Sequence, residues 1–492
     1  MTYRRGSLPP QVRLELAWRA YQQQGFYGAI TDLAASFGVS RWLVYHLLHV
    51  LVPVLLELAA PKPPGPKPLS GEVRVDKRHL DRAIVTLRVV GNVPLEGIQR
   101  SLEEILGIHR SIGYLSGVIS QAQQQASAFQ RQLVYRVSGT GLLDELFQHR
   151  NPLLVVIEPH STALLVLSQE SHRDGDTWGV RLLETEEQGF HFTQVVSDDA
   201  QGIATGVVAA LGQDISHQLD VGHLFGDMAR LEAELERSAY KHIQEEAERW
   251  SVLDSARSDR VITSRIKAWE QAHQKAKKTI WLYEDFYYLS EELYSLFSPI
   301  GPQGAPRSLT AVQQDLEALL SLLEQIPHPK VQELRKRLTN QQKGLLVFWE
   351  EWERCLSTLQ KTIPQPEILQ ALLLDYFLRK RKPTQTTQHA LEKTNAFIEE
   401  KIGEQATLRR EQVASTLDDL IRSSALVETA NSWLRPYLNI RKGSSQPFLD
   451  LIRLYRNTRT YRRGKRKEHS PFELLGISLP EDWLELVGLP RN

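Results

Sequence analysis

The chain has 492 residues, which is too long for one hydrophobic core and predicts about two to four domains. Hydrophobic residues make up 41% and charged residues 24%, the balance of an ordinary soluble globular protein. The formal net charge is zero, which argues against a protein that coats nucleic acid indiscriminately. A single cysteine, Cys355, excludes an intramolecular disulfide and a zinc site built from cysteines, and it fits a reducing cytoplasm.

Residues 1–59 are expected to form a helix-turn-helix DNA-binding module. A short helix from about residue 31 leads into a turn at Gly38, and Ser40 is suited to cap the helix that follows. Three side chains at the start of that helix are the candidates for contact with DNA: Arg41, Trp42 and Tyr45. The apolar stretch over residues 42–60 is interrupted by polar residues and by Pro53, so we expect a buried helix there and no membrane span.

Two further segments follow this module. Residues 60–75 are rich in proline, which favours an extended linker over a packed core. Residues 76–130 are expected to form a second helical module of the helix-turn-helix kind, with Arg110 in its turn as another candidate for binding DNA.

Residues 131–223 carry the pattern of a sheet with flanking helices. The apolar runs at residues 153–157 and 163–167 are too short for helices and predict neighbouring strands, and residues 178–183 and 192–196 are interpreted as further strands. Asp144 follows a short apolar run, with Glu145 beside it as a second choice. Asp198 follows the strand at 192–196, with Asp199 as its competitor, and the carboxyl end of a strand is where α/β sheets build their sites. His223 comes shortly afterwards.

Residues 224–412 change to long, charged, amphipathic helices, which we interpret as a helical insertion. Its tryptophans are expected in the cores between helices: Trp250, Trp269, Trp281, Trp349 and Trp352. Residues 413–492 return to the sheet domain, and a predicted helix there places Glu428, Asn431 and Arg435 on one face.

The last part of the chain also holds a basic stretch with Asp450 as its one acid. We expect it to contact phosphates, and its candidate residues, with Arg435, are Arg441, Lys442, Arg462, Arg463, Lys465 and Arg466.

The order of the three acids, with a helical insertion before the last, resembles the DDE transposases of bacterial insertion sequences, which belong to the retroviral integrase superfamily and have an RNase H-like catalytic domain. The segment after Glu428 is similar to the corresponding segment of that family: Asn431-Ser432, residues 434–438, Asn457, residues 463–466 and residues 470–476. The stretches at residues 196–198 and 219–223 are similar to the strand of the second aspartate and to the histidine-bearing strand that follows.

The resemblance implies an enzyme that binds transposon ends and catalyses cleavage and transfer of DNA strands. Asp144, Asp198 and Glu428 would be its catalytic and metal-binding residues, holding two Mg²⁺ ions, with Mn²⁺ as a possible substitute. Its partners would be double-stranded DNA, both terminal repeats and target, and further copies of the chain, at least a dimer when the ends are paired. It would act in the cytoplasm at the nucleoid.

Two alternatives stay open at this point. Asp199 competes with Asp198 for the role of the second acid. The whole chain can also be a catalytically inactive or domesticated derivative of a transposase, retained for binding DNA. The fold expected in either case is a multidomain α + α/β protein: helix-turn-helix modules, then an RNase H-like mixed sheet with flanking helices, interrupted by an all-helical insertion.

Overall fold

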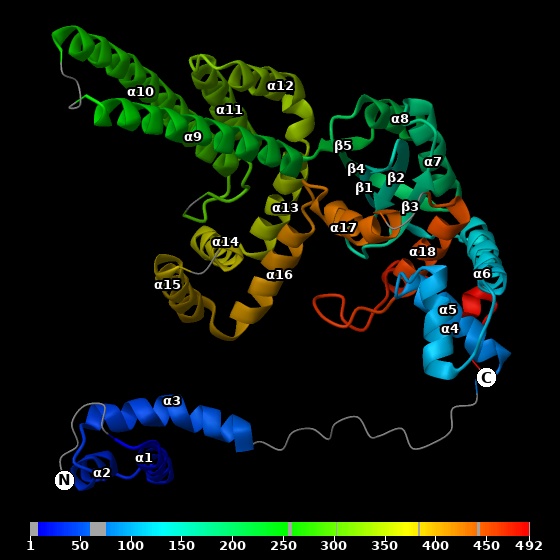
Figure 1. The fold of residues 1–492 in the computed structure, drawn as a ribbon, viewed down its shortest axis with the longest axis horizontal. Coiled ribbons are helices and arrows are strands. Elements are labelled where there is room, and N and C mark those ends of the chain that lie inside the picture. The colour runs from blue at the N-terminus through cyan, green and yellow to red at the C-terminus, as the bar shows by residue number, and fades with distance from the viewer. Residues whose placement is uncertain are drawn as a thin grey trace. The chain divides into compact units, whose positions relative to one another are not determined.

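The computed structural model describes residues 8–59, 75–253, 258–301, 303–381, 384–439 and 443–491. The chain divides into two compact units, Met1–Arg74 and Val75–Asn492 (Figure 1). The proline-rich linker at residues 60–74, Arg441 and Lys442 lie outside the described residues. Within the described part, most residues are helical and a single mixed sheet has five strands, which agrees with a multidomain α + α/β protein.

The first unit is a small helical bundle formed by α1 (Pro10–Gln22), α2 (Ala29–Ser36) and α3 (Arg41–Ala59). Its core contains Leu16, Ala20, Leu33 and Val44. Gly38 has a positive φ of 62° in the turn between α2 and α3, and the Ser40 hydroxyl accepts a hydrogen bond of 3.3 Å from the Leu43 amide. The predicted turn and helix cap are therefore present.

The second unit begins with three helices and continues into the sheet. The helices are α4 (Lys77–Val89), α5 (Leu95–Leu106) and α6 (Ile112–Gln132). The strands are β1 (Val137–Gln148), β2 (Asn151–Ile157), β3 (Leu164–Gln169), β4 (Phe190–Ser197) and β5 (Ser216–Leu219). Their order is β3-β2-β1-β4-β5, with β1–β2–β3 antiparallel and β1–β4–β5 parallel.

Each face of the sheet is covered by different helices. One face packs against α7 (Gly175–Glu187) and α8 (Gln201–Leu211), and the other packs against α17 (Ala425–Asn439). α18 (Gln446–Thr458) lies along the edge strand β3 and contributes to both cores. Because both faces are buried, β2 reads as a nearly continuous apolar run.

Side chains of α18 satisfy the open edge of β3. Gln446 accepts from the Gln169 amide at 3.0 Å and donates to the Leu167 carbonyl at 2.9 Å. Asn457 accepts from the Leu164 amide at 2.8 Å and donates to the Leu164 carbonyl at 2.9 Å. These amides take the place of a sixth strand, which blocks pairing of the edge with another chain.

The strand predicted at residues 178–183 is wrong, because these residues lie within α7. The Asp174 side chain caps this helix by accepting from the Thr177 amide at 3.0 Å. α7 also packs closely on α8 through glycines: a Cβ on Gly206 would lie 2.8 Å from the Gly175 carbonyl oxygen. Close packing between α7 and α8 therefore stabilises residues 178–183 as a helix, although their apolar residues alternate as in a strand.

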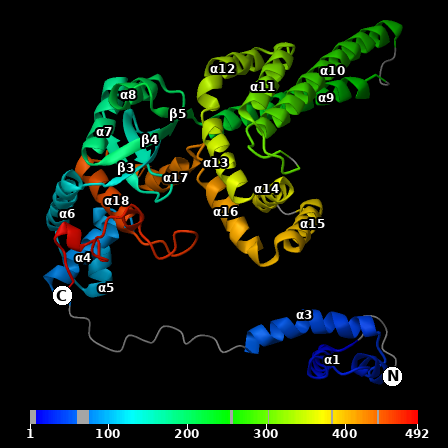
Figure 2. The ribbon, with the colours of Figure 1, turned by 180° about the vertical axis from the view of Figure 1, so that it is seen from behind.

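Between β5 and α17 the described chain forms helices, joined by loops of which one holds an isolated bridge between Ile300 and Pro306. The helices are α9 (Val221–Ser251), α10 (Asp259–Leu296), α11 (Leu309–Glu324), α12 (Pro329–Leu345), α13 (Phe348–Thr362), α14 (Pro366–Lys380), α15 (Gln385–Ile402), the short η1 (Gly403–Gln405) and α16 (Ala406–Asp418). α9 and α10 pair in antiparallel fashion as a long hairpin, seen from both sides in Figures 1 and 2.

The tryptophans of this helical insertion differ in burial, and Trp269 is half-buried beside Trp250. Trp349 and Trp352 are fully buried, as predicted. The prediction is wrong for Trp250 and Trp281, which are 60% and 57% exposed on the α9–α10 hairpin. Amphipathic periodicity places a residue on a helix face, but it does not determine whether a second helix covers that face.

The two ends of the helical insertion meet. The Val221 amide donates to the Arg422 carbonyl at 3.1 Å, and the Ser424 hydroxyl donates to Asp220. A Cβ on Gly222 would lie 2.5 Å from the Ser423 hydroxyl and 3.0 Å from Asp220 Oδ1, so a larger residue there would displace these side chains. The chain thus leaves the sheet and returns to it at one point.

The C-terminal segment closes the second unit with α19 (Pro471–Leu474) and η2 (Glu485–Val487). Ser470 and Glu473 form the capping box that the sequence predicts. Across the described ranges, no single helix is both long and apolar enough to span a membrane, and only α2 with part of α3 passes that test as a pair, bent by 105°.

Candidate functional site

Asp144 and Asp198 lie just beyond the point where the parallel pairing of β1 with β4 ends: Asp144 is within β1, which continues to Gln148, and Asp198 directly follows β4. The last paired residues of β1 and β4 are Leu142 and Val196, and each aspartate follows two positions later. Since side chains alternate along a strand, Asp144 shares the face of Leu142, which is the face covered by α17. The sheet therefore brings Asp144 and Asp198 to the same end of the paired strands β1 and β4.

Asp144 is buried, with 8% of its surface exposed. Its Oδ1 accepts from the Glu145 amide at 2.8 Å, and its Oδ2 accepts from the Asn431 side chain at 2.7 Å. Burial raises the pKa of Asp144 and outweighs these two hydrogen bonds, and the charge of Glu428 raises it further. Burial thus disfavours the charged form of the Asp144 carboxylate, a penalty that a nearby positive charge relieves.

Asp198 is half-buried and directly follows β4. Its Oδ1 accepts from the Ala200 amide at 3.1 Å, and burial raises its pKa, with smaller contributions from Glu145 and Asp199. Asp199 is exposed and accepts a hydrogen bond from Gln341 of α12. Of the two candidates for the second acid, Asp198 is therefore the one that shares its electrostatic surroundings with Asp144.

Glu428 lies in the first turn of α17 and is exposed. Its Oε2 is 3.7 Å from Arg435, and both side chains are more than half exposed. The negative charge of Glu428 raises the pKa of Asp144. Asn431, one turn further along α17, is fully buried against Asp144.

His223 supplies a positive charge beside the two aspartates. A hydrogen bond of 2.7 Å to Asp220 raises the pKa of His223 to about 9, against the effect of burial, and Asp144 and Asp198 add to the rise. Burial raises the pKa of Asp220, but hydrogen bonds from His223, Ser424 and the Gly222 amide outweigh it and hold the pKa at about 2. An imidazolium therefore offsets the charges of the acids.

Glu145 faces the opposite side of the sheet. It accepts from the Trp178 indole at 3.0 Å and from Arg173 at 2.9 Å, and its side chain is 8% exposed. These contacts join β1 to α7. Glu145 therefore has a structural role in this arrangement, and it acts on Asp198 only through its charge.

The residue types of this site suit Mg²⁺, but their positions do not form a complete set of metal ligands. Carboxylate oxygens are the ligands that Mg²⁺ prefers, and Oδ1 of Asn431 is a buried oxygen without a hydrogen-bond partner in the described part of the chain. Among the described residues, however, no three His, Cys, Asp or Glu side chains form a group that could hold a metal ion. A ligand set with Asp144, Asp198 and Glu428 thus requires Glu428 to move inward.

The predicted DNA-binding residues lie in separate places. Arg41, Trp42 and Tyr45 are exposed at the start of α3, and Arg110 is exposed before α6. In the C-terminal segment, Lys465 pairs with Asp418, and Arg466 donates to the carbonyls of Pro159 and His160 at 2.7 and 2.6 Å.

Arg462 and Arg463 are exposed, and neither has a carboxylate within ion-pair distance among the described residues. Of the basic side chains at 462–466, two therefore anchor the loop and two are available for phosphate. Arg435 is exposed and pairs only loosely with Glu428.

Sequence reasoning missed Asp220 and Ser424, which position His223. Asp220 directly precedes α9 and caps it, and Ser424 directly precedes α17. Asp220 lies three residues before His223, a spacing that brings two side chains together at the start of a helix. This spacing could have predicted the contact between Asp220 and His223. Nothing local in the sequence indicates that Ser424 reaches the same carboxylate.

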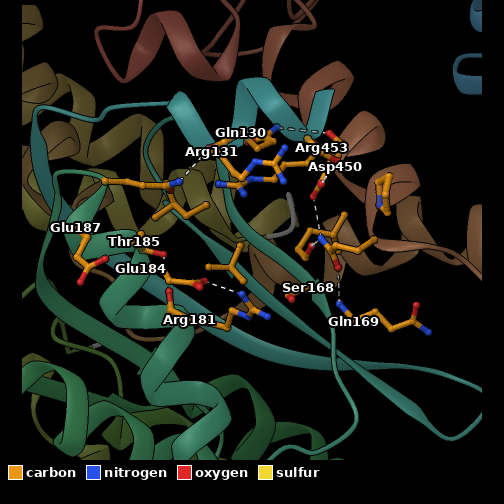
Figure 3. A pocket seen from close by; sticks show the side chains of 17 residues that line it. Gln130, Arg131, Ser168, Gln169, Arg181, Glu184, Thr185, Glu187, Asp450 and Arg453 are labelled. Carbon is orange, nitrogen blue, oxygen red and sulfur yellow. Dashed lines mark hydrogen bonds and ion pairs between the residues drawn. The ribbon is translucent and has the colours of Figure 1, made fainter. Parts of the chain in front are cut away.

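A cavity of about 790 Å³ lies apart from these acids, between α6, β3, α7 and α18 (Figure 3). Two of its arginines are already paired: Arg181 contacts Glu170 and Glu184, while Arg453 donates to the Leu164 carbonyl and to Tyr135. Ser127 and Gln446 both donate to Asp450. These contacts connect the edge strand to its surrounding helices and indicate a structural role for the cavity walls.

Comparison with known proteins identifies no family for this chain. No protein-family model matches the sequence, and no curated protein matches it. The solved structures that match include the strand transfer complex of the Drosophila P element transposase, which aligns with 74% of this chain and 99% of its own chain, at 13% identity and a TM-score of 0.29. At that TM-score the alignment defines neither the fold nor the function of this chain.

Proposed function

We propose that the chain is a DDE transposase, a metal-dependent enzyme that cleaves DNA at transposon ends and joins the freed strands to target DNA. One observation carries the proposal: Asp144 and Asp198 lie just beyond the end of the parallel pairing of β1 with β4, and α17, which packs on that face, carries Glu428 and Asn431. A mixed sheet interrupted by a helical insertion also matches the expectation of an RNase H-like core.

The reaction is an in-line displacement at phosphorus. Two Mg²⁺ ions, or Mn²⁺ in their place, would activate the attacking oxygen and stabilise the leaving oxygen when bound. Asp144, Asp198 and Glu428 would be the residues that hold these ions. Burial prepares Asp144 for this role, because a desolvated carboxylate gains more from a nearby cation than an exposed one does.

Glu428 has the freedom that this proposal requires. Its partner Arg435 is 3.7 Å away, and a pair so exposed is worth about 0–1 kcal/mol. Breaking this ion pair therefore costs little, and the bound cations would offset the repulsion between Glu428 and Asp144. Arg435, once released, is proposed to bind a DNA phosphate.

DNA binding is proposed to use both units. The α2–α3 pair of the first unit supports a helix-turn-helix function, with Arg41, Trp42 and Tyr45 toward the DNA and Arg110 as a further contact. Arg462 and Arg463 are proposed to hold phosphates of the DNA backbone. Pairing two transposon ends would require at least two copies of the chain.

The proposal is tested by cleavage and strand transfer on the element's terminal-repeat DNA with Mg²⁺. Asp144→Asn, Asp198→Asn and Glu428→Gln should each abolish both reactions, because each removes a negative ligand, while DNA binding in EDTA persists. Asp199→Asn is the matched control and should keep activity. Activity retained in any of the first three variants contradicts the assignment.

A non-catalytic DNA-binding protein is the second candidate. It is favoured by the lack of a three-residue metal group among the described residues and by the imidazolium of His223 beside the aspartates. The same assay separates the two candidates: tight DNA binding without Mg²⁺-dependent cleavage by the unaltered chain would favour the second.

A further inference from the structure

A pocket of about 750 Å³ lies on the side of α17 opposite the acids. Glu428, Asn431 and Arg435 share one face of this helix, while Trp433 and Tyr437 are about half a turn away and line the pocket. The volume falls within the roughly 300–1,000 Å³ that small-molecule sites occupy. The pocket is therefore a separate site carried by the same helix.

The lining combines aromatic rings with basic side chains. Its members include Trp433, Tyr437, Tyr461, Arg459, Arg462 and Lys467. The rings of Trp433 and Tyr437 lie 5.2 Å apart at an angle of 54°. Aromatic faces beside guanidinium groups are the combination that binds unpaired nucleotides, because every base offers a π-face and every nucleotide a phosphate.

Arg456 fixes the rings in place. Its guanidinium carbon lies 5.3 Å from the Trp433 ring centre and 5.6 Å from that of Tyr461, so it is held between two aromatic faces. It also donates to the Tyr461 hydroxyl at 3.3 Å, and that hydroxyl contacts Thr162 as well. The rings are thus positioned before any ligand arrives, which lowers the entropy cost of binding.

The basic side chains of the pocket carry more positive charge than its acidic residue neutralises. Glu468 is the acid in the lining, and it pairs with Lys467 at 2.9 Å. Among the described residues, no carboxylate lies within ion-pair distance of Arg459 or Arg462. Both are exposed, and a guanidinium can hold a phosphate through two parallel hydrogen bonds.

We infer that this pocket binds an unpaired nucleotide of a DNA strand, with the base stacked on Trp433 and its phosphate held by Arg459 and Arg462. A base within a duplex cannot stack in this way because its neighbours cover both faces. The choice of DNA rests on the proposed function. The strand would then cross α17 from this pocket to the acids, so the site selects DNA with an unpaired end.

Binding in EDTA tests the inference without any cleavage. Fluorescence anisotropy of the full chain is measured on a short duplex ending in a few unpaired thymidines, and on the same duplex with abasic sites in place of the thymidines. The unaltered chain should prefer the thymidine end, and Trp433→Ala should weaken binding to it by about 5- to 150-fold while leaving the abasic duplex unaffected. Trp433→Phe keeps a ring and should retain most of the preference.

Trp281→Ala is the matched control. Trp281 is 57% exposed and has Lys277 over its ring at 4.8 Å, but it lies on α10, so its loss should change neither affinity. Arg462→Ala, an exposed change that spares the core, should weaken binding to the thymidine end. Equal affinity of the unaltered chain for both duplexes overturns the inference, as does an unchanged preference in Trp433→Ala and Arg462→Ala together.

A duplex with an unpaired RNA end distinguishes the sugar. Stronger binding to the RNA end than to the DNA end would overturn the assignment to DNA. The two proposals also fail separately. A chain that prefers unpaired thymidines but never cleaves loses the proposed catalysis and keeps this pocket, and a chain that cleaves without that preference does the reverse.

Discussion

The side-chain amide of Asn431 donates a hydrogen bond of 2.7 Å to Oδ2 of Asp144, across 287 positions of sequence. Asn431 is 1% exposed and Asp144 is 8% exposed, so this bond is made in a nearly dry interior. It joins the helix of Glu428 to the central strand. It also fixes the orientation of the carboxylate that the proposed chemistry needs.

Replacing Asn431 by alanine should lower the free energy of unfolding by about 1–3 kcal/mol, because a buried carboxylate loses a donor. Urea unfolding at neutral pH measures the change. Ser432→Ala is the control, since the Ser432 hydroxyl is exposed and bonds only to the Thr429 carbonyl of its own helix. A loss in Asn431→Ala no larger than in Ser432→Ala would show that the bond adds nothing to stability.

Asp220→Asn should lower the pKa of His223 from about 9 toward its ordinary value of 6.5, because the hydrogen bond to a carboxylate is the main cause of the rise. A raised pKa in the folded state stabilises the fold below pH 6.5, and this stabilisation is lost as pH rises through 9. Asp220→Asn should therefore flatten the pH dependence of stability between 6.5 and 9.

Proton NMR of the histidine rings gives the pKa directly, with His223→Gln identifying the resonance. Urea unfolding at the two ends of this pH range gives the stability. If the His223 pKa stays near 9 in Asp220→Asn, then Asp144 and Asp198 are its main cause.

Asp418 ties α16 to α14 and to the C-terminal loop. Burial raises its pKa, but hydrogen bonds from Lys465, Lys380 and Tyr376 outweigh burial and bring it to about 2. A lowered pKa stabilises the fold above the unfolded value of about 3.9, and the contribution is lost as pH falls toward 2.

Asp418→Asn should therefore cost about 1 kcal/mol at neutral pH, a figure reduced for solvent screening, and the cost should shrink below about pH 4. Urea unfolding of both proteins from pH 7 to pH 3 measures the difference. Asp419→Asn, an exposed neighbour, serves as the control. A difference that stays constant over this range would mean that the Asp418 pKa is ordinary.

Asn457→Ala should expose the edge of β3. The Leu164 amide would lose its acceptor, at a cost of about 1–3 kcal/mol, while the Leu164 carbonyl would keep its bond from Arg453. Hydrogen exchange at the Leu164 amide should accelerate more than the global loss of stability explains. Exchange that follows global stability alone would show that the edge is protected by burial and not by Asn457.

The pattern of strands near the site was predictable because it is local. The apolar run at residues 153–157 lies within β2, the run at 163–167 overlaps β3 in all but its first residue, and the capping box at Ser470 is recognisable from four residues. Residues 178–183 misled, because Trp178, Val180 and Leu182 alternate as in a strand. The buried set of α7, Trp178, Gly179, Leu182 and Thr185, follows the helical repeat, and it depends on close packing against Gly206.

The proximity of Asp144 and Asp198 at one end of the sheet could be predicted from the strand residues that precede each of them. The hydrogen bond from Asn431 could not, since only the shared helix face of Glu428 and Asn431 is visible in the sequence. The charge of His223 depends on Asp220 and, through it, on Ser424, 204 positions away from Asp220. Contacts of this kind require the fold itself.

The meeting of the insertion's two ends at Asp220 and Ser424 has a consequence for synthesis. A ribosome adding about 5–20 residues per second needs roughly 10–40 s to make the intervening segment. During that time the strands exist, but α17 and α18 do not, so the edge of β3 lacks Gln446 and Asn457 and one face of the sheet lies bare. The nascent chain would then depend on chaperones to prevent its exposed edge from aggregating.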